Sequence, residues 1–233
     1  HVWNNGIGWG SEDLPYQLAN AGYKVILSCV SNLYFDLAYE KSPDEIGYYW
    51  GGFNDLNKPF DFIPFDYYKN TTEDTNGNPI QSSLFNGKER LNDYGKSNIV
   101  GIQGQLFSEN VRNTTILDYL LAPKLLALAE RSWSQNPSWA TEKDPVKTTE
   151  LYTKDWSQFV NVLGKKELPR LDYYHGGYNY RIPPVGAIIE NGKVIANIQQ
   201  PGFTIRYTTD GSEPKNNSTI YNYPIDAKAK IKL

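Results

Sequence analysis

The pattern of apolar positions predicts alternating strands and helices over the N-terminal two-thirds of the chain. Residues 23–30 (YKVILSCV) and 98–107 (NIVGIQGQLF) are almost continuously apolar, which is typical of strands buried on both faces of a parallel sheet. Leucines and alanines recur at three- and four-residue spacing over residues 115–133, which predicts a helix that Pro123 bends or delays. A second helix is expected over residues 145–163. This order of elements is typical of a parallel sheet wrapped by helices.

Shorter elements and one long irregular segment complete this region. Ser11 is placed to cap a short helix that ends at Gly22. Residues 88–96 are expected to be partly helical, and Gly164 is expected to stop the last helix. Residues 31–80 have no long helical period and are rich in Tyr, Phe, Asp, Asn, Gly and Pro. So long an irregular segment in a compact domain is usually functional.

The character of the sequence changes near residue 181. Residues 182–184 (IPP) are typical of a linker, and short β-type runs follow them. We therefore expect two domains, over residues 1–180 and 181–233.

The second domain is predicted to be a small antiparallel β-sandwich. Asn191-Gly192 separates two apolar runs and predicts a hairpin. Residues 203–209 and 228–233 alternate between apolar and polar positions, which predicts further strands. Because this pattern continues to the last residue, we expect the sandwich to be truncated.

Charge and composition exclude several classes of function. The 23 basic and 26 acidic residues leave a net charge of −3, so nothing in the overall charge favours nucleic acid or an anionic membrane. No apolar run approaches the roughly 20 residues of a membrane span. Cys29 is the only cysteine, and His1 and His175 are the only histidines. We expect no disulfide, no metal site and no cofactor.

Aromatic residues are abundant, at 14% of the chain. Such side chains stack on flat apolar faces and offer a polar edge, as sugar-binding surfaces require, although most of them are expected to fill the core. Four tryptophans, Trp9, Trp133, Trp139 and Trp156, are assigned to the core.

Several long blocks of the sequence resemble the family 20 glycoside hydrolases, the β-N-acetylhexosaminidases and chitobiases. The blocks are residues 32–36 (NLYFD), 47–52 (GYYWGG), 101–109 (GIQGQLFSE), 125–133 (LLALAERSW), 167–171 (ELPRL) and 207–214 (YTTDGSEP). The resemblance implies an α/β fold, the C-terminal portion of a (β/α)8 TIM barrel followed by a small antiparallel β-sandwich. The last three barrel strands are then expected to end at Trp3, at Cys29–Val30 and at Gln105–Phe107.

The resemblance also implies an activity. Members of this family are retaining exo-enzymes that hydrolyse terminal N-acetyl-β-D-hexosamine, and the acetamido oxygen of the substrate itself attacks the anomeric carbon. An Asp-Glu pair assists in a motif His-x-Gly-Gly-Asp-Glu, which this chain lacks. The acidic pairs Glu12-Asp13, Asp44-Glu45 and Glu73-Asp74 have the wrong order or context. We expect the catalytic pair upstream of this chain, and the fragment alone to be inactive.

Six residues are expected to contact the sugar by the same resemblance. Tyr34 would hold the acetamido oxygen, Asp36 a hydroxyl at carbon six, and Glu109 the four-hydroxyl. The aromatic walls would be Trp3, Trp50 and Phe107, with Phe107 standing where the family usually has Trp. Three purely structural interpretations also remain: Tyr34 as a core residue, Asp36 in an Asx turn, and Glu109 at a helix N-terminus.

Two other interpretations of the chain stay open. The aromatic content and the missing acid pair are also compatible with a non-catalytic carbohydrate-binding protein that keeps a barrel remnant. Alternatively, residues 182–233 form an interaction module and the rest is scaffold. The expected partners are N-acetylhexosamine-terminated glycans or chitooligosaccharides and the upstream part of the same polypeptide, in a periplasmic or secreted location.

Overall fold

The computed structural model describes all 233 residues, and the chain divides into two compact units. The first comprises His1–Leu151 with Asn179–Arg181, and the second comprises Tyr152–Tyr178 with Ile182–Leu233. The domain boundary expected at residue 180 stays a prediction. None of the helices is both long enough and apolar enough to cross a bilayer.

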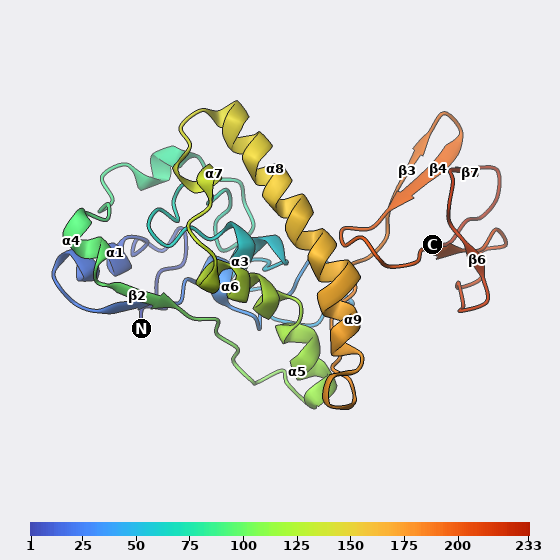
Figure 1. Cartoon of the computed structure of the whole chain (residues 1–233), viewed down its shortest axis with the longest axis horizontal. Coiled ribbons are helices and arrows are strands. Elements are labelled where there is room, and N and C mark those ends of the chain that lie inside the picture. Colours follow the sequence, from blue (N-terminus) through green and yellow to red (C-terminus); the bar gives the residue numbers. More distant parts are fainter. The chain divides into compact units, whose positions relative to one another are not determined.

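The first unit combines short helices with a small parallel sheet (Figure 1). Its elements are α1 (Leu14–Asn20), β1 (Val25–Leu27), α2 (Val30–Leu33), α3 (Asn57–Asp61), η1 (Ser82–Phe85), α4 (Asp93–Lys96), β2 (Ile99–Ile102), α5 (Thr114–Leu121), α6 (Lys124–Trp133), α7 (Ser138–Thr141) and the first part of α8 (Pro145–Val162). The segment between β1 and β2 contains only short helices, as its lack of a long helical period predicts.

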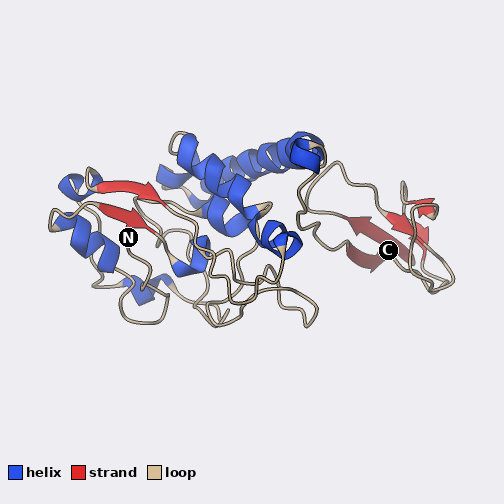
Figure 2. Ribbon diagram, turned by 90° about the horizontal axis from the view of Figure 1, so that it is seen from below, coloured by secondary structure: helices blue, strands red, loops and turns tan.

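The parallel sheet is built around β1. This strand pairs in parallel with β2, and Val2 forms a parallel bridge with Leu27 on the opposite edge of β1. Figure 2 shows β1 and β2 as two neighbouring arrows with the same direction. The parallel arrangement predicted from the apolar runs is therefore present, with Val2 in the place expected for a strand that ends at Trp3.

Both strands end earlier than the sequence predicts. The carbonyl of Cys29 accepts a hydrogen bond from the N–H of Leu33 at 2.8 Å, so Val30 begins α2 and the expected strand end at Cys29–Val30 is wrong. β2 ends at Ile102, and only a bridge between Gln105 and Tyr34 continues the pairing toward Phe107. None of the four residues of β2 is fully buried, and Val100 is 56% exposed, so the expected burial of β2 on both faces is also wrong.

The predicted long helix over residues 115–133 is divided into α5 and α6 at Pro123. Proline has no N–H with which to continue the ladder, so the break falls where the sequence places the disturbance. The helix expected to end at Gly164 instead continues from α8 into the π-turn η2 (Leu163–Glu167) and then α9 (Leu168–Leu171). At Gly164 any Cβ would collide with the carbonyl oxygen of Pro201, which explains the glycine without a helix stop.

The core of the first unit lies around β1 and is rich in aromatic side chains. Its buried members are Val2, Ile7, Tyr16, Ala19, Val25, Leu27, Cys29, Leu33, Phe62, Tyr67, Tyr68 and Phe85. Trp139 is also buried, as predicted, whereas Trp9 and Trp133 are 45% and 91% exposed. The assignment of these two tryptophans to the core is wrong, because a helical spacing or a glycine-rich context does not fix which face a side chain takes.

The second unit carries small antiparallel sheets. β3 (Gly186–Glu190) and β4 (Lys193–Asn197) form the predicted hairpin, with Asn191 and Gly192 both at positive φ, and β7 (Ile225–Asp226) pairs with β4. A second sheet pairs β5 (Arg206–Tyr207) with β6 (Thr219–Ile220). The short helix η3 (Tyr174–Gly176) lies between α9 and β3. The last residues form only isolated bridges to Thr208 and Asp210 instead of the expected strand.

One glycine fixes the path of the segment after α2. Gly47 has φ of +135°, and a Cβ built on it would lie 2.5 Å from the backbone nitrogen of Ala38. This close approach allows Tyr48 to donate its N–H to the carbonyl of Asp36 at 2.8 Å and to accept from the N–H of Ala38 at 2.9 Å. Gly47 is therefore required for the pairing of residues 36–38 with the segment that carries Trp50.

We predict that Gly47→Ala lowers the free energy of unfolding by roughly 2–4 kcal/mol, because it adds both a disfavoured φ and a backbone collision. Chemical denaturation measures the change. Gly101→Ala is the matched control, since no atom lies within 4 Å of a Cβ at that position. Equal stability of the two variants would contradict this account of the loop.

Candidate functional site

A pocket of about 540 Å³ opens in the first unit, at the side of the sheet where β1 and β2 end. Its lining residues are Trp3, Trp9, Val30, Tyr34, Asp36, Tyr48, Trp50, Gln105, Phe107 and Glu109. All six residues that the sequence singles out as sugar contacts lie in this lining, although they span more than a hundred positions of the chain. The roles assigned to them stay predictions.

Aromatic rings form the walls of the pocket. The ring of Tyr34 packs edge-on against Trp50, with centroids 5.7 Å apart, and tilted against Phe107 at 5.5 Å. Trp3, Trp50 and Phe107 are 43–55% exposed, so their faces remain open to the pocket. Exposed aromatic faces around a concave site suit a ligand with flat apolar surfaces and polar edges.

Tyr34 lies at the C-terminal end of α2 and is only 1% exposed. Its hydroxyl donates to the carbonyl of Trp3 at the long distance of 3.4 Å, so a better acceptor in the pocket could take this hydrogen bond. Burial, and then the charge of Asp36, raise the pKa of Tyr34 to about 12. The hydroxyl is therefore a proton-bearing donor at neutral pH.

Several backbone groups around Asp36 are hydrogen-bonded to other parts of the chain. The side chain of Asn54 donates to the carbonyl of Tyr34 at 2.7 Å, and the N–H of Tyr48 donates to the carbonyl of Asp36 at 2.8 Å. On the other side, the N–H of Phe35 donates to the carbonyl of Gln105 at 2.6 Å. This segment is thereby tied to two neighbouring stretches of chain, and the Asp36 side chain has a defined position.

The carboxylate of Asp36 is buried and has unused acceptors. The residue is 2% exposed, and neither of its side-chain oxygens has a hydrogen-bond partner. Burial raises the pKa of Asp36 to about 6, and Glu109 adds repulsion, although the nearby backbone N–H groups and the Lys124 ammonium favour the ionised form. A buried carboxylate that is only weakly paired is costly, so this site is prepared for a ligand that supplies stronger donors.

Glu109 adds a second acceptor at the open side of the pocket. It follows β2 in an exposed stretch, and it lies near enough to Asp36 for the two charges to repel each other. No helix begins at Glu109, because α5 starts at Thr114 with Asn113 as its cap. The interpretation of Glu109 as a helix N-terminal acid is therefore wrong.

Four residues of the lining were not predicted from the sequence, and Trp9 is the only tryptophan among them. Its ring stacks on Trp50 at 6.1 Å with an interplanar angle of 23°, and its Nε1 donates to Thr75 Oγ1 at 3.1 Å. Gly6 lies directly beneath this ring, since a Cβ there would collide with it at 2.5 Å. The glycines around Trp9 were the available signal, because they allow a large ring to lie flat on the backbone. The other three residues are Val30, Tyr48 and Gln105.

The three acidic pairs of the sequence are not part of the lining. Glu12 accepts from the N–H groups of Gly8 and Gly10 at 2.9 Å and pairs with Lys88, which explains it as a loop-fixing residue. Asp74 fixes a turn through Asn76 and Asn78, as described below. No group of three or more His, Cys, Asp and Glu side chains is arranged to hold a metal ion. The lining of the pocket supplies hydroxyl, amide, carboxylate and aromatic groups.

We predict that Asp36→Asn raises the melting temperature at pH 8. The native pKa of Asp36 lies above the value of about 3.9 in an unfolded chain, so ionisation destabilises the fold above about pH 6 and has no such effect below about pH 4. The difference in melting temperature between Asp36→Asn and the unmodified protein should therefore shrink as the pH falls from 6 to 4. Thermal unfolding followed by circular dichroism at both ends of this range measures it.

Asp74→Asn is the control with the opposite sign. Asp74 accepts from the N–H groups of Asn76 and Asn78, which lowers its pKa, so its ionised form stabilises the fold. This variant should lose stability at pH 8. A loss of stability in Asp36→Asn at pH 8 would show that its carboxylate has donors after all.

The chain is similar to known proteins along most of its length. Residues 2–136 match the model of the glycosyl hydrolase family 20 catalytic domain, and residues 167–233 match that of the chitobiase/beta-hexosaminidase C-terminal domain. A beta-hexosaminidase of Vibrio vulnificus is 35% identical over 90% of this chain and 26% of its own length. The N,N'-diacetylchitobiase of Vibrio harveyi is 34% identical over 87% of this chain and 23% of its own length.

Solved structures give weaker likenesses. The GH20 beta-N-acetylhexosaminidase of Streptomyces coelicolor A3(2) has a TM-score of 0.49 at 20% identity, over 78% of this chain and 28% of that one. The GH20 exo beta-N-acetylglucosaminidase of Vibrio harveyi in complex with N-acetylglucosamine has a TM-score of 0.41 at 21% identity, over 73% and 21%. The chain spans about a quarter of the length of the two curated relatives named above. On the match of residues 2–136 and these identities, the chain belongs to glycosyl hydrolase family 20.

Proposed function

We propose that this chain forms the sugar-binding part of a retaining exo-β-N-acetylhexosaminidase, which hydrolyses terminal N-acetyl-β-D-hexosamine residues of glycans or chitooligosaccharides. The Asp-Glu pair, of which Glu protonates the leaving group and Asp orients the acetamido group, lies in a part of the protein outside this chain. The observation that carries the proposal is the buried carboxylate of Asp36, which has two unpaired oxygens inside an aromatic-walled pocket. A sugar ring offers apolar faces for the walls and hydroxyl groups for these acceptors.

The residues of this chain bind and orient the sugar in the proposed mechanism. The Tyr34 hydroxyl donates to the acetamido oxygen, turns it toward the anomeric carbon and stabilises the charge that develops during its attack. Asp36 and Glu109 accept from hydroxyl groups at the non-reducing end, which restricts the enzyme to terminal residues. The rings of Trp3, Trp50 and Phe107 exclude water from one side of the sugar.

The wider setting of the pocket is part of the same proposal. Val2, β1 and β2 are parallel and adjacent, which is compatible with the last strands of a (β/α)8 barrel, whose sites lie at the C-terminal ends of the strands. The strands of residues 181–233 then correspond to an appended β-sandwich. Because polymeric glycans are met outside the cytoplasm, we propose a periplasmic or secreted location.

The test uses the full-length protein that contains this chain and a 4-nitrophenyl N-acetyl-β-D-glucosaminide. We expect hydrolysis with retention of the anomeric configuration, measured by NMR of the first-formed product. Tyr34→Phe removes a donor aimed at developing charge and should lower kcat by about 10²- to 10³-fold. Tyr23→Phe is the matched control, since Tyr23 is 64% exposed and lies outside the pocket lining.

Two outcomes would contradict the proposal. Binding of N-acetylglucosamine without hydrolysis would favour a non-catalytic carbohydrate-binding protein. Undiminished activity in a Tyr34→Phe, Glu109→Gln double variant would remove the roles given to both side chains.

A further prediction concerns Trp9. This side chain is held by Thr75 and stacks on Trp50, so we expect it to keep the Trp50 ring in place for the sugar next to the cleaved bond. Trp9→Ala should raise KM for diacetylchitobiose by about two- to tenfold, as the loss of one aromatic pair implies, and change KM for the aryl glycoside less. Trp133→Ala is the control, because Trp133 is 91% exposed and lies outside the pocket lining. Equal changes for both substrates would show that Trp9 does not act through Trp50.

A further inference from the structure

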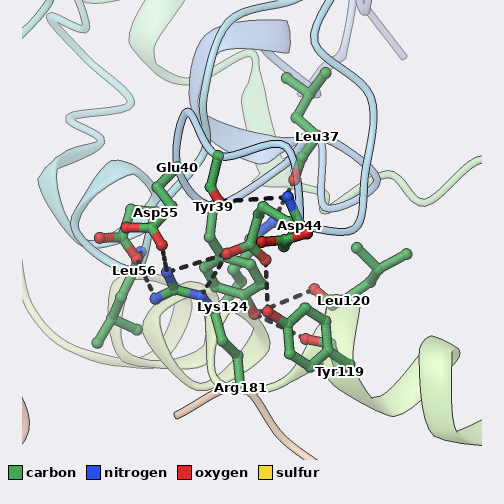
Figure 3. A network of polar contacts seen from close by, with 12 residues as sticks. Leu37, Tyr39, Glu40, Asp44, Asp55, Leu56, Tyr119, Leu120, Lys124 and Arg181 are labelled. Carbon is green, nitrogen blue, oxygen red and sulfur yellow. Dashed lines mark hydrogen bonds and ion pairs between the residues drawn. The ribbon is translucent and has the colours of Figure 1, made fainter. Parts of the chain in front are cut away.

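A buried lysine lies behind the carboxylate of the pocket. Lys124 is the first residue of α6 and is fully buried. Its Nζ donates to the carbonyl of Leu37 at 2.7 Å (Figure 3) and to the carbonyl of Phe35 at 3.1 Å. These two residues stand on either side of Asp36 in the sequence. The ammonium group thus binds the backbone carbonyls of both residues that flank Asp36 in the sequence.

We infer that Lys124 is a positioning residue for sugar recognition: it holds Asp36 so that its carboxylate is directed into the pocket and keeps it ionised, ready to accept a substrate hydroxyl. This inference rests on the proposed function. It assigns to a side chain outside the pocket lining a part in choosing the substrate.

The ammonium group of Lys124 is enclosed by two hydrogen bonds and one aromatic ring. Two of the three N–H donors are used on the carbonyls of Phe35 and Leu37, and the ring of Tyr39 lies 3.8 Å from Nζ, where it covers the remaining side. A lysine used only to fill space would not need its charged end at this position. An apolar side chain of similar length would leave both carbonyl groups unpaired.

The other acids near Lys124 are already paired with a different cation. The guanidinium nitrogens of Arg181 lie 3.4 Å from Glu40 and 3.6 Å from Asp55 (Figure 3), and 3.3 Å from Glu45. The guanidinium carbon also lies 4.6 Å from the centroid of the Tyr39 ring. Tyr119 adds a hydrogen bond to Glu45 at 2.5 Å. Asp36 has no such partner, so Lys124 is the cation that offsets its charge.

The electrostatic effects on both groups agree with this geometry. Burial lowers the pKa of Lys124 to about 7, while the charges of Asp55, Asp36 and Glu45 favour its protonated form and Arg181 opposes it. In turn the ammonium group favours the ionised form of Asp36 against burial and against the repulsion of Glu109. Without the cation, Asp36 would take up a proton at a higher pH and would lose acceptor capacity.

The experiment compares kcat/KM of the full-length protein for three aryl N-acetyl-β-glucosaminides: the unmodified sugar, its 6-deoxy analogue and its 4-deoxy analogue. The unmodified protein should prefer the unmodified sugar over each analogue by at least about tenfold, as a hydrogen bond to a charged group implies. Lys124→Met should lose most of the preference over the 6-deoxy sugar and keep the preference over the 4-deoxy sugar, which depends on Glu109. Lys124→Gln should behave likewise, and Lys124→Arg, which keeps the cation, should retain both preferences.

The pH dependence supplies a second measurement. The preference over the 6-deoxy sugar should fall as the pH drops through the pKa of Asp36, and this acid limb should move to higher pH in either neutral variant. If neither neutral variant is folded by circular dichroism, Lys124→Arg decides the matter: because Lys124 is already protonated near the pKa of Asp36, the retained cation should leave the acid limb in place. An acid limb moved to higher pH in Lys124→Arg would overturn the inference.

Lys69→Met is the matched control for the loss of a lysine that binds carbonyl groups. Lys69 Nζ donates to the carbonyls of Trp139, Ala140 and Glu142 at 2.9, 3.0 and 2.7 Å, away from the pocket. It should lose stability with both preferences unchanged. The inference would be overturned if Lys124→Met and Lys124→Gln preferred the unmodified sugar over the 6-deoxy sugar as strongly as the unmodified protein does. If the unmodified protein showed no hydrolysis, or neither preference, the proposed function would be overturned instead.

Discussion

The pocket depends on the hydrogen bonds that fix the backbone carbonyls of residues 34–37. Each carbonyl in this stretch has a donor: Asn54 for Tyr34, Lys124 for Phe35 and Leu37, and the N–H of Tyr48 for Asp36. These donors come from three separate parts of the chain. Because all main-chain acceptors are occupied, the side chains of Tyr34 and Asp36 are the groups left to meet a ligand.

This arrangement has a cost in stability that only a ligand relieves. A carboxylate without donors and a buried ammonium group are both unfavourable in the empty protein, and their mutual attraction offsets only part of that cost. Replacing the Asp36 carboxylate with a neutral group would stabilise a protein that had no ligand to bind, whereas Lys124 also pairs two backbone carbonyls. Their presence together behind an aromatic pocket is therefore better explained by recognition than by folding.

The residues of the site could be predicted from the sequence better than the strand ends and side-chain packing that bring them together. Tyr34, Asp36 and Glu109 follow apolar runs, and parallel strands bring such positions to one side of a sheet. Trp9 was missed because its glycine-rich context allows the ring to lie flat on the backbone but does not by itself fix which face the side chain takes. Lys124 was missed because a lysine at the start of a helix is ordinarily a surface residue, and its burial follows from the packing of α6 against distant segments.

The charged cluster behind the pocket also links the site to a distant part of the chain. Arg181 is only 3% exposed at its side chain, and its N–H donates to the carbonyl of Ala122 at 3.0 Å, just before Pro123 and Lys124. Asn179 is held on the same helix through the carbonyl of Thr115 at 3.0 Å. A chain ending at residue 180 would leave Glu45 and Asp55 without their cation, so that Lys124 would become the nearest positive charge for them. Its attraction would then be divided between these acids and Asp36, which ties the electrostatics of the pocket to the residue that precedes the linker.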